Sequence, residues 1–377
     1  SSNGLEKRPK LRFPGFDDPY RTITLGQIAS LVNRTDPTSN APIMMLSAGN
    51  GFIMQSEKYS RDNAGQSLKK YILLKKGELA YNHGASKAKQ YGCCYELTEN
   101  EARIPYVYHC FKISGTEHTP YVATALNNPK IDRQLKRLVS SSVRMDGLLN
   151  ISFDDYMSVI LHLPSLKEQT HIADFLKKFD ERITSQEKLV ASLKKYKRGL
   201  LSNAFRNASS WRKKRLGEIC CIRTGKLDAN AMVNDGKYPF FTCARERYSI
   251  DTYAFDTDAL LISGNGANVG YIHHYTGKFN AYQRTYVLDQ FQEDINYVHV
   301  FLNRFLSSRI DAEKKAGNTP YIVLSTLSDM EIYIPDETTT KQLVDLFTQI
   351  ENRISYSATV LEYLSSQRRG LLQQLFI

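Results

Sequence analysis

Two stretches of the chain, residues 163–205 and 334–376, alternate hydrophobic positions three and four residues apart. Such a seven-residue repeat is typical of a helix whose apolar stripe packs against another helix. Each stretch predicts one helix of roughly 40 residues, about 60 Å long at 1.5 Å per residue. The predicted pairing positions are Ile172, Leu176, Phe179, Ile183, Val190, Leu193 and Leu200 in the first stretch, and Leu343, Phe347, Ile350, Ile354, Leu361, Leu364 and Leu371 in the second.

The two stretches are also copies of each other, separated by 171 residues. Aligned without a gap, ten of their 43 positions are identical. Polar residues interrupt both stripes at the same two steps, Gln186/Ser357 and Lys197/Arg368, where they would fix the register of paired helices. We therefore predict that the helices pair with each other, the alternative being that each packs only on its neighbouring domain.

Each copy contains Arg-Gly-Leu-Leu, with the glycine at Gly199 and at Gly370. Glycine inside a helix is unfavourable, so it marks either a helix end or a close approach of two backbones. Because the apolar spacing continues beyond both glycines, we expect continuous helices with a close backbone contact there.

Residues 1–162 and 207–333 lie outside the long helices and resemble each other at their ends. Leu25–Ile28 reads LGQI and Leu216–Ile219 reads LGEI, whereas the middles differ. Both middles predict short strands joined by turns, followed by one amphipathic helix each, at 119–139 and 295–315. The predicted fold is α+β: two β-rich domains, 1–162 and 207–333, joined by helical regions 163–206 and 334–377 that pair as an antiparallel coiled coil in a circular, pseudo-twofold arrangement.

The composition and net charge of the chain indicate the kind of partner it binds and the compartment it occupies. The formal charge of +11, with the excess of basic residues before residue 207, favours an anionic partner. The chain contains no stretch of 18 uncharged apolar residues and no apolar signal core, which indicates a cytosolic protein. The six cysteines lack zinc-ligand spacing and are expected to be reduced, mostly buried thiols.

Catalytic motifs are not convincing. Ser263–Gly270, SGNGANVG, lacks the spacing of a phosphate-binding loop and precedes a predicted strand. Gly317–Tyr321, GNTPY, differs from the N-P-P-Y motif of amino-methyltransferases, and no cofactor loop accompanies it. Glu313-x-Lys315 has no aspartate suitably placed for a nuclease site. We therefore predict a protein that binds rather than catalyses.

The two divergent middles are rich in side chains that read nucleic acids. Arginine, asparagine and glutamine can make bidentate contacts with base edges, whereas lysine and serine suit phosphates. A solvated loop is the alternative for each residue taken singly. The DNA-binding candidates are Asn82, Ser86, Lys87, Lys89 and Gln90 in the first middle, and Arg245, Arg247, Asn265, Asn268, Gln283 and Arg284 in the second.

The chain resembles the specificity (S) subunit of type I restriction–modification systems. The resemblance spans nearly the whole chain and is carried by LPSLKEQTHIADFLKKFDERI and KKYKRGLLSNAF, by their copy at 334–376, by the openings KLRFPGFDDPYRTITLGQI and WRKKRLGEI, and by GKFNAYQRTYVL. The second copy departs from the Pro-x-x-x-x-Gln start, because Thr340 stands where the first copy has Gln169.

This resemblance implies two target-recognition domains, each reading one half of a split site in double-stranded DNA, and two spacer helices. It also implies docking to two methyltransferase subunits and to restriction (translocase/nuclease) subunits in the cytoplasm of a bacterium or archaeon, as a defence against phage. S-adenosylmethionine, ATP and Mg would be bound by those subunits, with no cofactor or metal on this chain. The alternatives are a coiled-coil adaptor with protein-binding domains and a stand-alone DNA methyltransferase.

Overall fold

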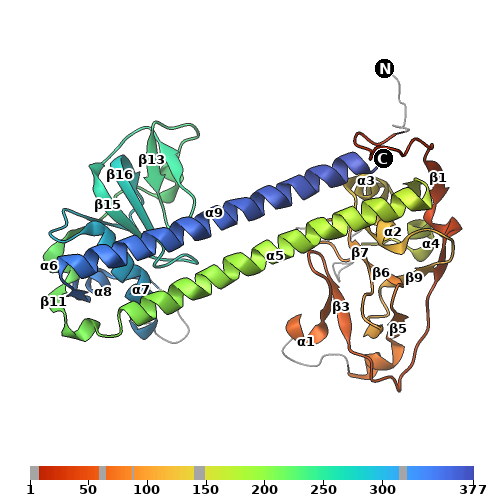
Figure 1. The fold of residues 1–377 in the computed structure, drawn as a ribbon, viewed down its shortest axis with the longest axis horizontal. Coiled ribbons are helices and arrows are strands. Elements are labelled where there is room, and N and C mark those ends of the chain that lie inside the picture. The colour runs from red at the N-terminus through yellow and green to blue at the C-terminus, as the bar shows by residue number, and fades with distance from the viewer. Residues whose placement is uncertain (1–7, 59–64, 87–88, 140–148, 314–320) are drawn as a thin grey trace. The chain divides into compact units, whose positions relative to one another are not determined.

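The structure is a computed structural model of the 377-residue chain and describes residues 8–58, 65–86, 89–139, 149–313 and 321–377. The chain divides into two compact units (Figure 1). Unit 1 comprises Ser1–Ser185 and Leu361–Ile377, and unit 2 comprises Gln186–Val360. Both units combine sheets with helices, which confirms the predicted α+β class. No helix among the described residues is both long and apolar enough to cross a lipid bilayer.

Two helices of 39 residues each contribute to both units. Helix α5 spans Leu166–Ala204 and helix α9 spans Glu337–Leu375. The two helices therefore start 171 residues apart and end 171 residues apart, which is the separation of the two sequence copies. Helix α5 begins in unit 1 and ends in unit 2, and α9 does the reverse. The predicted length of both helices, and their continuation through the two glycines, are confirmed.

The helices pair antiparallel within unit 2. Gln186 donates from Nε2 to the backbone carbonyl of Ser357 at 2.8 Å, and Leu193 packs with Ile350 and Ile354. Because the partner on α9 moves toward its N-terminus as α5 advances, the two chains run in opposite directions. The predicted polar pair Gln186/Ser357 is therefore a direct contact.

Two ion pairs, one in each unit, are related by the sequence repeat. In unit 2, Lys197 of α5 pairs with Glu351 of α9. In unit 1, Arg368 of α9 pairs with Asp180 of α5 through two bonds, of which Nη2 to Oδ2 measures 2.9 Å. The hydrogen bond to the Asp180 carboxylate is the largest influence on the pKa of Arg368 and raises it. Burial opposes this shift, but the pKa stays above its usual value. The basic residue that interrupts each stripe is thus neutralised by the partner helix.

The predicted pairing positions all lie on the covered side of their helices. Eight of them are buried, at 9% exposure or less: Ile172, Leu176, Val190, Leu193, Leu343, Phe347, Ile350 and Ile354. The other six are half-buried: Phe179, Ile183, Leu200, Leu361, Leu364 and Leu371.

The described residues of unit 1 form ten short strands: β1 Arg21–Thr24, β2 Ala29–Leu31, β3 Met44–Ser47, β4 Gly51–Met54, β5 Ile72–Lys75, β6 Leu79–Asn82, β7 Cys93–Glu96, β8 Glu101–Ile104, β9 His109–Ile113 and β10 Ile160–Leu163. The main sheet has the order β2-β9-β6-β7 and is antiparallel. Strands β1 and β10, β3 and β4, and β5 and β8 form separate antiparallel pairs. The short strands predicted for this domain are confirmed.

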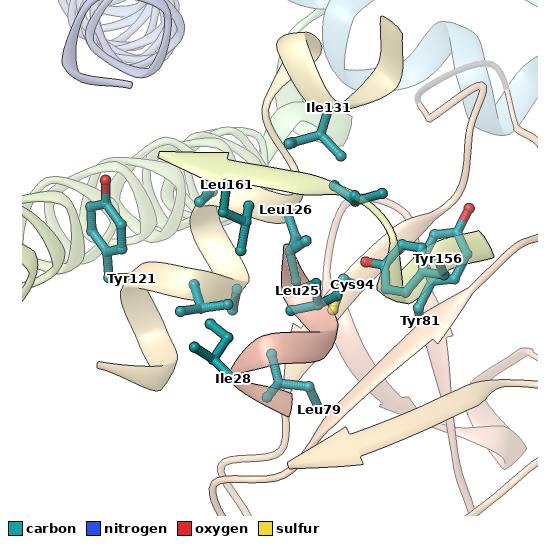
Figure 2. Close-up of a cluster of buried hydrophobic side chains, with 14 of the residues drawn as sticks. Leu25, Ile28, Leu79, Tyr81, Cys94, Tyr121, Leu126, Ile131, Tyr156 and Leu161 are labelled. Carbon is teal, nitrogen blue, oxygen red and sulfur yellow. The ribbon is translucent and has the colours of Figure 1, made fainter. Parts of the chain in front are cut away.

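The helices of unit 1 besides α5 and α9 are short: α1 Gln55–Lys58, α2 Thr119–Leu126, α3 Pro129–Leu138, α4 Phe153–Met157, and the 3-10 turns η1 Leu25–Gln27 and η2 Gly65–Lys70. The main core lies between the sheet, α2, α3 and the ends of the two long helices (Figure 2). The rings of Tyr81 and Tyr156 stack there at 3.9 Å between centroids. Tyr121 of α2 stacks on Phe376 at 5.1 Å, which places the last turn of α9 against the first domain as the circular arrangement predicts.

Unit 2 is built on a six-stranded sheet in the order β12-β17-β15-β16-β13-β14, in which only β13 and β16 run parallel. Its strands are β11 Arg212–Arg215, β12 Cys221–Thr224, β13 Tyr238–Phe241, β14 Tyr248–Ile250, β15 Phe255–Ser263, β16 Ile272–Ala281, β17 Thr285–Asp289 and β18 Glu331–Ile334. Its short helices are α6 Leu216–Ile219, α8 Leu324–Ser328, and the turns η3 Ala208–Ser210 and η4 Ala229–Ala231. Helix α7, Ile295–Glu313, packs with the end of α5 and the start of α9 in one core.

The similar ends of the two β-rich segments pair with each other inside each unit. Strand β1 pairs with β10, and β11 pairs with β18, so each domain is closed by its own first and last strands. Two residues after β1 and β11, a Cβ on Gly26 would lie 3.4 Å from Met157, and a Cβ on Gly217 would lie 3.1 Å from Ser328. The shared Leu-Gly sequence therefore permits the opening turn to approach the closing helix.

The single helix predicted for 119–139 is wrong. The segment forms α2 and α3, separated by Asn127 and Asn128. Pro129 cannot supply a backbone N–H to a continuing helix, and Asn128 instead caps α3 by accepting from the Lys130 amide at 3.0 Å. The corresponding prediction for 295–315 is confirmed by α7 as far as Glu313; residues 314–315 lie outside the described part of the chain.

The close backbone contact expected at the two helical glycines is also wrong. A Cβ on Gly199 would have no atom within 4 Å, and one on Gly370 would meet only the side chain of Gln374 at 4.0 Å. Both positions therefore have room for a side chain.

Replacing Gly199 or Gly370 with alanine is expected to stabilise the protein by about 1 kcal/mol per site, because alanine loses less backbone entropy in a helix. The measurement is the shift of the urea midpoint in chemical unfolding. Gly225→Ala is the matched control, since its Cβ would overlap the carbonyl of Ala281 and should lower the midpoint. A lower midpoint for Gly199→Ala would show that the glycine has a packing role.

Candidate nucleic-acid interface

Four of the six candidates in unit 2 meet at one end of the β15–β16 hairpin. Arg245 donates from Nε to Oδ1 of Asn268 at 3.2 Å, and Asn268 donates from Nδ2 to the carbonyl of Cys243 at 3.2 Å. The Asn268 amide thus uses its acceptor to orient the guanidinium and its donor to anchor the loop. Arg245 also lies over the ring of Tyr271, 5.3 Å from its centroid, which further restricts the arginine.

Arg284 joins the same site through its backbone. Its carbonyl accepts from the Gly264 amide at 2.9 Å and from the Cys243 thiol at 3.3 Å. A Cβ on Gly264 would overlap this carbonyl, so the glycine allows the two loops to touch. Asn265, next to Gly264, forms an isolated β-bridge with Tyr321.

The two remaining candidates flank this group. Gln283 precedes Arg284, is exposed, and donates its amide to the carbonyl of Leu227 at 2.9 Å. Arg247 lies over the ring of Tyr275, 5.8 Å from its centroid. We name the six residues Arg245, Arg247, Asn265, Asn268, Gln283 and Arg284 the unit 2 cluster. The structure brings them together from three loops separated by up to 39 residues of sequence.

The charge of the unit 2 cluster is positive. Arg245, Arg247 and Arg284 are exposed, and none of them takes part in an ion pair among the residues that the structure describes. Glu246 stands between two of them in sequence but makes no such pair either. Nearby His273 lies with Nε2 3.2 Å from the carbonyl of Ala244, and burial lowers its pKa. The neutral ring adds no charge, so the three arginines determine the positive electrostatic potential of the unit 2 cluster.

Chemically, the unit 2 cluster presents donors and acceptors on a fixed frame. A guanidinium held at Nε keeps its two Nη groups available, which is the edge that pairs with guanine O6 and N7 or with phosphate. Asparagine and glutamine can exchange two hydrogen bonds with adenine. No group of three metal-ligating side chains occurs in the described ranges, so the arrangement suits recognition rather than metal-assisted chemistry.

The candidates of unit 1 do not form a comparable group. Ser86 and Lys89 bond each other, from the Ser86 amide to the Lys89 carbonyl at 3.0 Å and from the Lys89 amide to the Ser86 hydroxyl at 3.0 Å. Lys89 donates its ammonium to the carbonyl of Asn127 at 2.8 Å, and Asn82 accepts from the Gly84 amide at 2.9 Å. These side chains support the loop, whereas Gln90 is exposed. Lys87 lies outside the described residues.

The rejected motifs have structural explanations where they are described. Ser263–Gly270 forms the loop between β15 and β16, so it precedes a strand as expected. Glu313 accepts from the Thr326 hydroxyl at 2.6 Å and pairs with Arg309 at 2.8 Å. Lys315 and most of GNTPY lie outside the described residues. All six cysteines are free thiols, four of them buried, and burial raises the pKa of Cys93 to about 11.

The glutamine of the Pro-x-x-x-x-Gln sequence has an internal role. Gln169 is fully buried and donates from Nε2 to the Pro164 carbonyl at 3.0 Å and to the Glu117 carboxylate. Its Oε1 accepts from the amide of His118, which precedes α2, at 3.0 Å. The residue therefore fastens α2 to the start of α5. Thr340, its counterpart in the second copy, makes no equivalent side-chain bond among the described contacts.

Sequence reasoning missed a second basic region, on α3 of unit 1. Lys130, Arg133 and Arg137 recur at a three- and four-residue spacing, which is the signal that places them on one helix face. They line a pocket with Lys10, described below.

Comparison with known proteins shows similarity over the second part of the chain. Residues 208–364, which include the whole unit 2 cluster, match the family model described as the type I restriction modification DNA specificity domain. The type I restriction enzyme EcoDI specificity subunit of Escherichia coli is 37% identical over 166 residues, which are 43% of this chain and 37% of that protein. This part of the chain is therefore similar to the type I restriction modification DNA specificity domain. The match of the chain spans little more than a third of the length of that curated relative.

Solved structures show a likeness in fold over nearly the full length of the chain. The S subunit of the type I restriction–modification system from M. genitalium has a TM-score of 0.64 at 17% identity, covering 98% of this chain and 99% of that one. A chain from a structural study of assembly and conformational transition of the type I system has a TM-score of 0.55 at 16% identity, covering 97% and 99%. The arrangement of elements in each unit is therefore that of type I S subunits.

Proposed function

We propose that the chain is the DNA-sequence-specificity subunit of a type I restriction–modification complex. It recognises a split target in double-stranded DNA, with one half-site read by each β-rich domain. The observation that carries this proposal is the unit 2 cluster, where unpaired arginines and oriented amides lie within the segment that matches the specificity domain. Bidentate arginine and amide contacts are the usual means of reading bases in the major groove.

The proposed division of the chain follows the sequence boundaries. Residues 1–162 and 207–333 act as target-recognition domains 1 and 2, and residues 163–206 and 334–377 act as spacer regions. Two reading domains on paired helices suit a target made of two half-sites at a fixed separation. Two moderate half-site affinities on one chain also reinforce each other through effective concentration.

We further propose that the chain itself is non-catalytic and assembles with two methyltransferase subunits and with restriction subunits. S-adenosylmethionine, ATP and Mg belong to those partners in this proposal. The outward faces of the long helices support docking, because they expose large side chains that the helix pairing leaves uncovered. In unit 2 these are Leu189, Tyr196, Leu346 and Tyr356, and in unit 1 Tyr363.

Replacing Arg245 with alanine is expected to weaken binding of the target duplex by the chain in complex with its methyltransferase subunits. The expected loss is about 10- to 100-fold, the 1–3 kcal/mol of a bidentate base contact. Binding of a scrambled duplex should change much less. Fluorescence anisotropy on both duplexes at fixed salt measures the ratio.

Arg206→Ala is the matched control, because Arg206 is exposed in unit 2 just beyond α5 and lies outside the unit 2 cluster. It should leave the ratio of target to scrambled binding unchanged. If the wild-type complex showed neither sequence selectivity nor salt dependence, the proposal of DNA recognition would fail.

A further inference from the structure

A basic pocket of about 690 Å³ lies on unit 1, and its lining includes none of the DNA-binding candidates named above. Four cationic side chains line it: Lys10 from the N-terminal segment, and Lys130, Arg133 and Arg137 from α3. No aspartate or glutamate side chain is among its described lining residues. The backbone carboxylate of Ile377 is the one opposing charge among these described lining residues, and the four cationic side chains outnumber it, so the pocket favours an anion.

The arginines of this pocket are not neutralised elsewhere. Neither Arg133 nor Arg137 forms an ion pair with any described residue, and both are exposed. Lys130 donates to the carbonyl of Phe376 at 3.0 Å, which fixes its ammonium at the edge of the cavity. Asp132, on the same helix, does not line the pocket and is half-buried.

The helix that carries these charges is held rigidly. The side chain of Gln134 bonds both backbone groups of Ile160, donating to the carbonyl at 2.9 Å and accepting from the amide at 2.8 Å. Asn128 caps α3 and donates to the carbonyl of Leu372 at 2.8 Å. Arg133 and Arg137, four residues apart on this fixed helix, have Cβ atoms about 5–6 Å apart on one face. The fold therefore already fixes the helix backbone that carries the two arginines.

The pocket adjoins the candidate loop of unit 1. Asn127, which precedes the pocket residue Asn128, accepts the ammonium of Lys89 at 2.8 Å and bonds the amide of Cys94 through Oδ1 at 3.1 Å. Lys89 and the pocket residue Asn128 are thus linked through Asn127. An anion in the pocket would be a near neighbour of whatever contacts that loop.

We propose that this pocket binds backbone phosphates of the DNA that carries the target, with Arg133 and Arg137 as the principal contacts. The inference rests on the proposed function and adds a positioning site for the DNA backbone in unit 1. Guanidinium groups match phosphate oxygens with paired hydrogen bonds, and phosphate contacts fix register without reading sequence. An extended polyanion next to a recognition loop supplies such phosphates without a further partner.

The test compares Arg133→Gln/Arg137→Gln with Lys136→Gln in the complex with methyltransferase subunits. Lys136 is exposed on the same helix but does not line the pocket. Anisotropy is measured on target and scrambled duplexes over a range of KCl concentrations. Loss of two phosphate contacts should reduce the slope of log K against log salt by about 1.8, whereas the control should barely change it. Both duplexes should weaken by the same factor, leaving their affinity ratio at the wild-type value.

Two further measurements check that the variants fold and distinguish DNA phosphates from an acidic protein surface as the occupant of the pocket. Thermal unfolding checks that the variants fold, and Arg133→Lys/Arg137→Lys, which keeps the charge, should retain most of the slope. An unchanged slope in the glutamine double variant overturns the inference, as does loss of the methyltransferase subunits on purification, which would assign the pocket to an acidic protein surface. In both cases wild-type selectivity persists, whereas absence of wild-type selectivity would overturn the proposed function itself.

Discussion

Replacing Arg12 with alanine is expected to lower the free energy of unfolding of unit 1 by about 3–5 kcal/mol, because it leaves a buried carboxylate without its partner. Glu168 is fully buried in the first turn of α5. Arg12 reaches it through Nε to Oε1 at 2.9 Å and Nη2 to Oε2 at 2.7 Å. Tyr20 donates a further bond to Oε1 at 3.2 Å.

The bonds around Glu168 explain why the effect should be large. Arg12 also donates to the carbonyl of Asp18 at 2.7 Å, so one guanidinium fastens the N-terminal segment to the start of α5. The hydrogen bonds that Arg12 donates to Glu168 raise the pKa of Arg12, and burial raises the pKa of Tyr20, so the arginine stays charged and the phenol protonated. Removal of the arginine leaves Tyr20 alone to compensate the charge.

Urea unfolding followed in unit 1, by hydrogen exchange of its core amides, measures this loss. The double variant Arg12→Met/Glu168→Leu should recover much of it, since an apolar pair carries no unpaired charge. Lys213→Ala is the surface control: that lysine pairs with Glu331 at 3.7 Å, both are more than half exposed, and the expected cost is below about 1 kcal/mol. A loss below 1 kcal/mol for Arg12→Ala would contradict the assigned role.

Removing residues 183–189 and 354–360 together is expected to abolish binding of the original target and to create affinity for one with a shorter gap between the same half-sites. These segments are matched heptads of the repeat, and each contains one member of the Gln186–Ser357 contact. Seven residues shorten a helix by about 10.5 Å, which corresponds to about three base pairs at 3.4 Å each. Because the seam stays in register, the pairs Asp180–Arg368 and Lys197–Glu351 should be retained.

Selection of bound sequences from a randomised duplex pool measures both the half-sites and the gap. Deleting residues 183–189 alone is the control, because it leaves the two helices of unequal length and misaligns one of the ion pairs. That variant should bind neither target well. An unchanged gap in the double deletion would show that the helices do not set the spacing, and altered half-sites would show that they contribute to base recognition.

The long helices could be predicted from the sequence because their signal is repeated and local. The seven-residue spacing recurs at the same offset, and the two helices begin and end at that offset. The similar Leu-Gly openings also indicated a common framework. What they could not reveal is its physical basis, the pairing of β1 with β10 and of β11 with β18, since those partners are separated by more than 100 residues of sequence.

Other predictions depended on which residues lie nearby in the folded chain, and the sequence does not show this. Gly199 and Gly370 read as sites of close contact, but their surroundings are open. Lys89 read as a phosphate ligand, but Asn127 lies within reach of its ammonium. The break between α2 and α3 was the exception, because Asn128-Pro129 is a local signal that the amphipathic spacing of 119–139 concealed.

The candidates of unit 2 illustrate the opposite case. Arg245 and Asn268 were selected for their chemistry alone, and the structure shows them bonded across two loops. Their contribution to sequence recognition stays a prediction. It depends on the direction of the free guanidinium edge toward DNA, which no feature of the sequence specifies.

The most direct test of the central claim is to map the DNA sites selected by the wild-type chain assembled with its methyltransferase subunits, by sequencing the methylated positions in treated genomic DNA. The account predicts one bipartite motif, with two specified half-sites separated by a constant number of unspecified bases. Arg245→Ala should relax the specified bases of one half-site and leave the other intact. A single continuous motif, or methylation without sequence preference, would contradict the account.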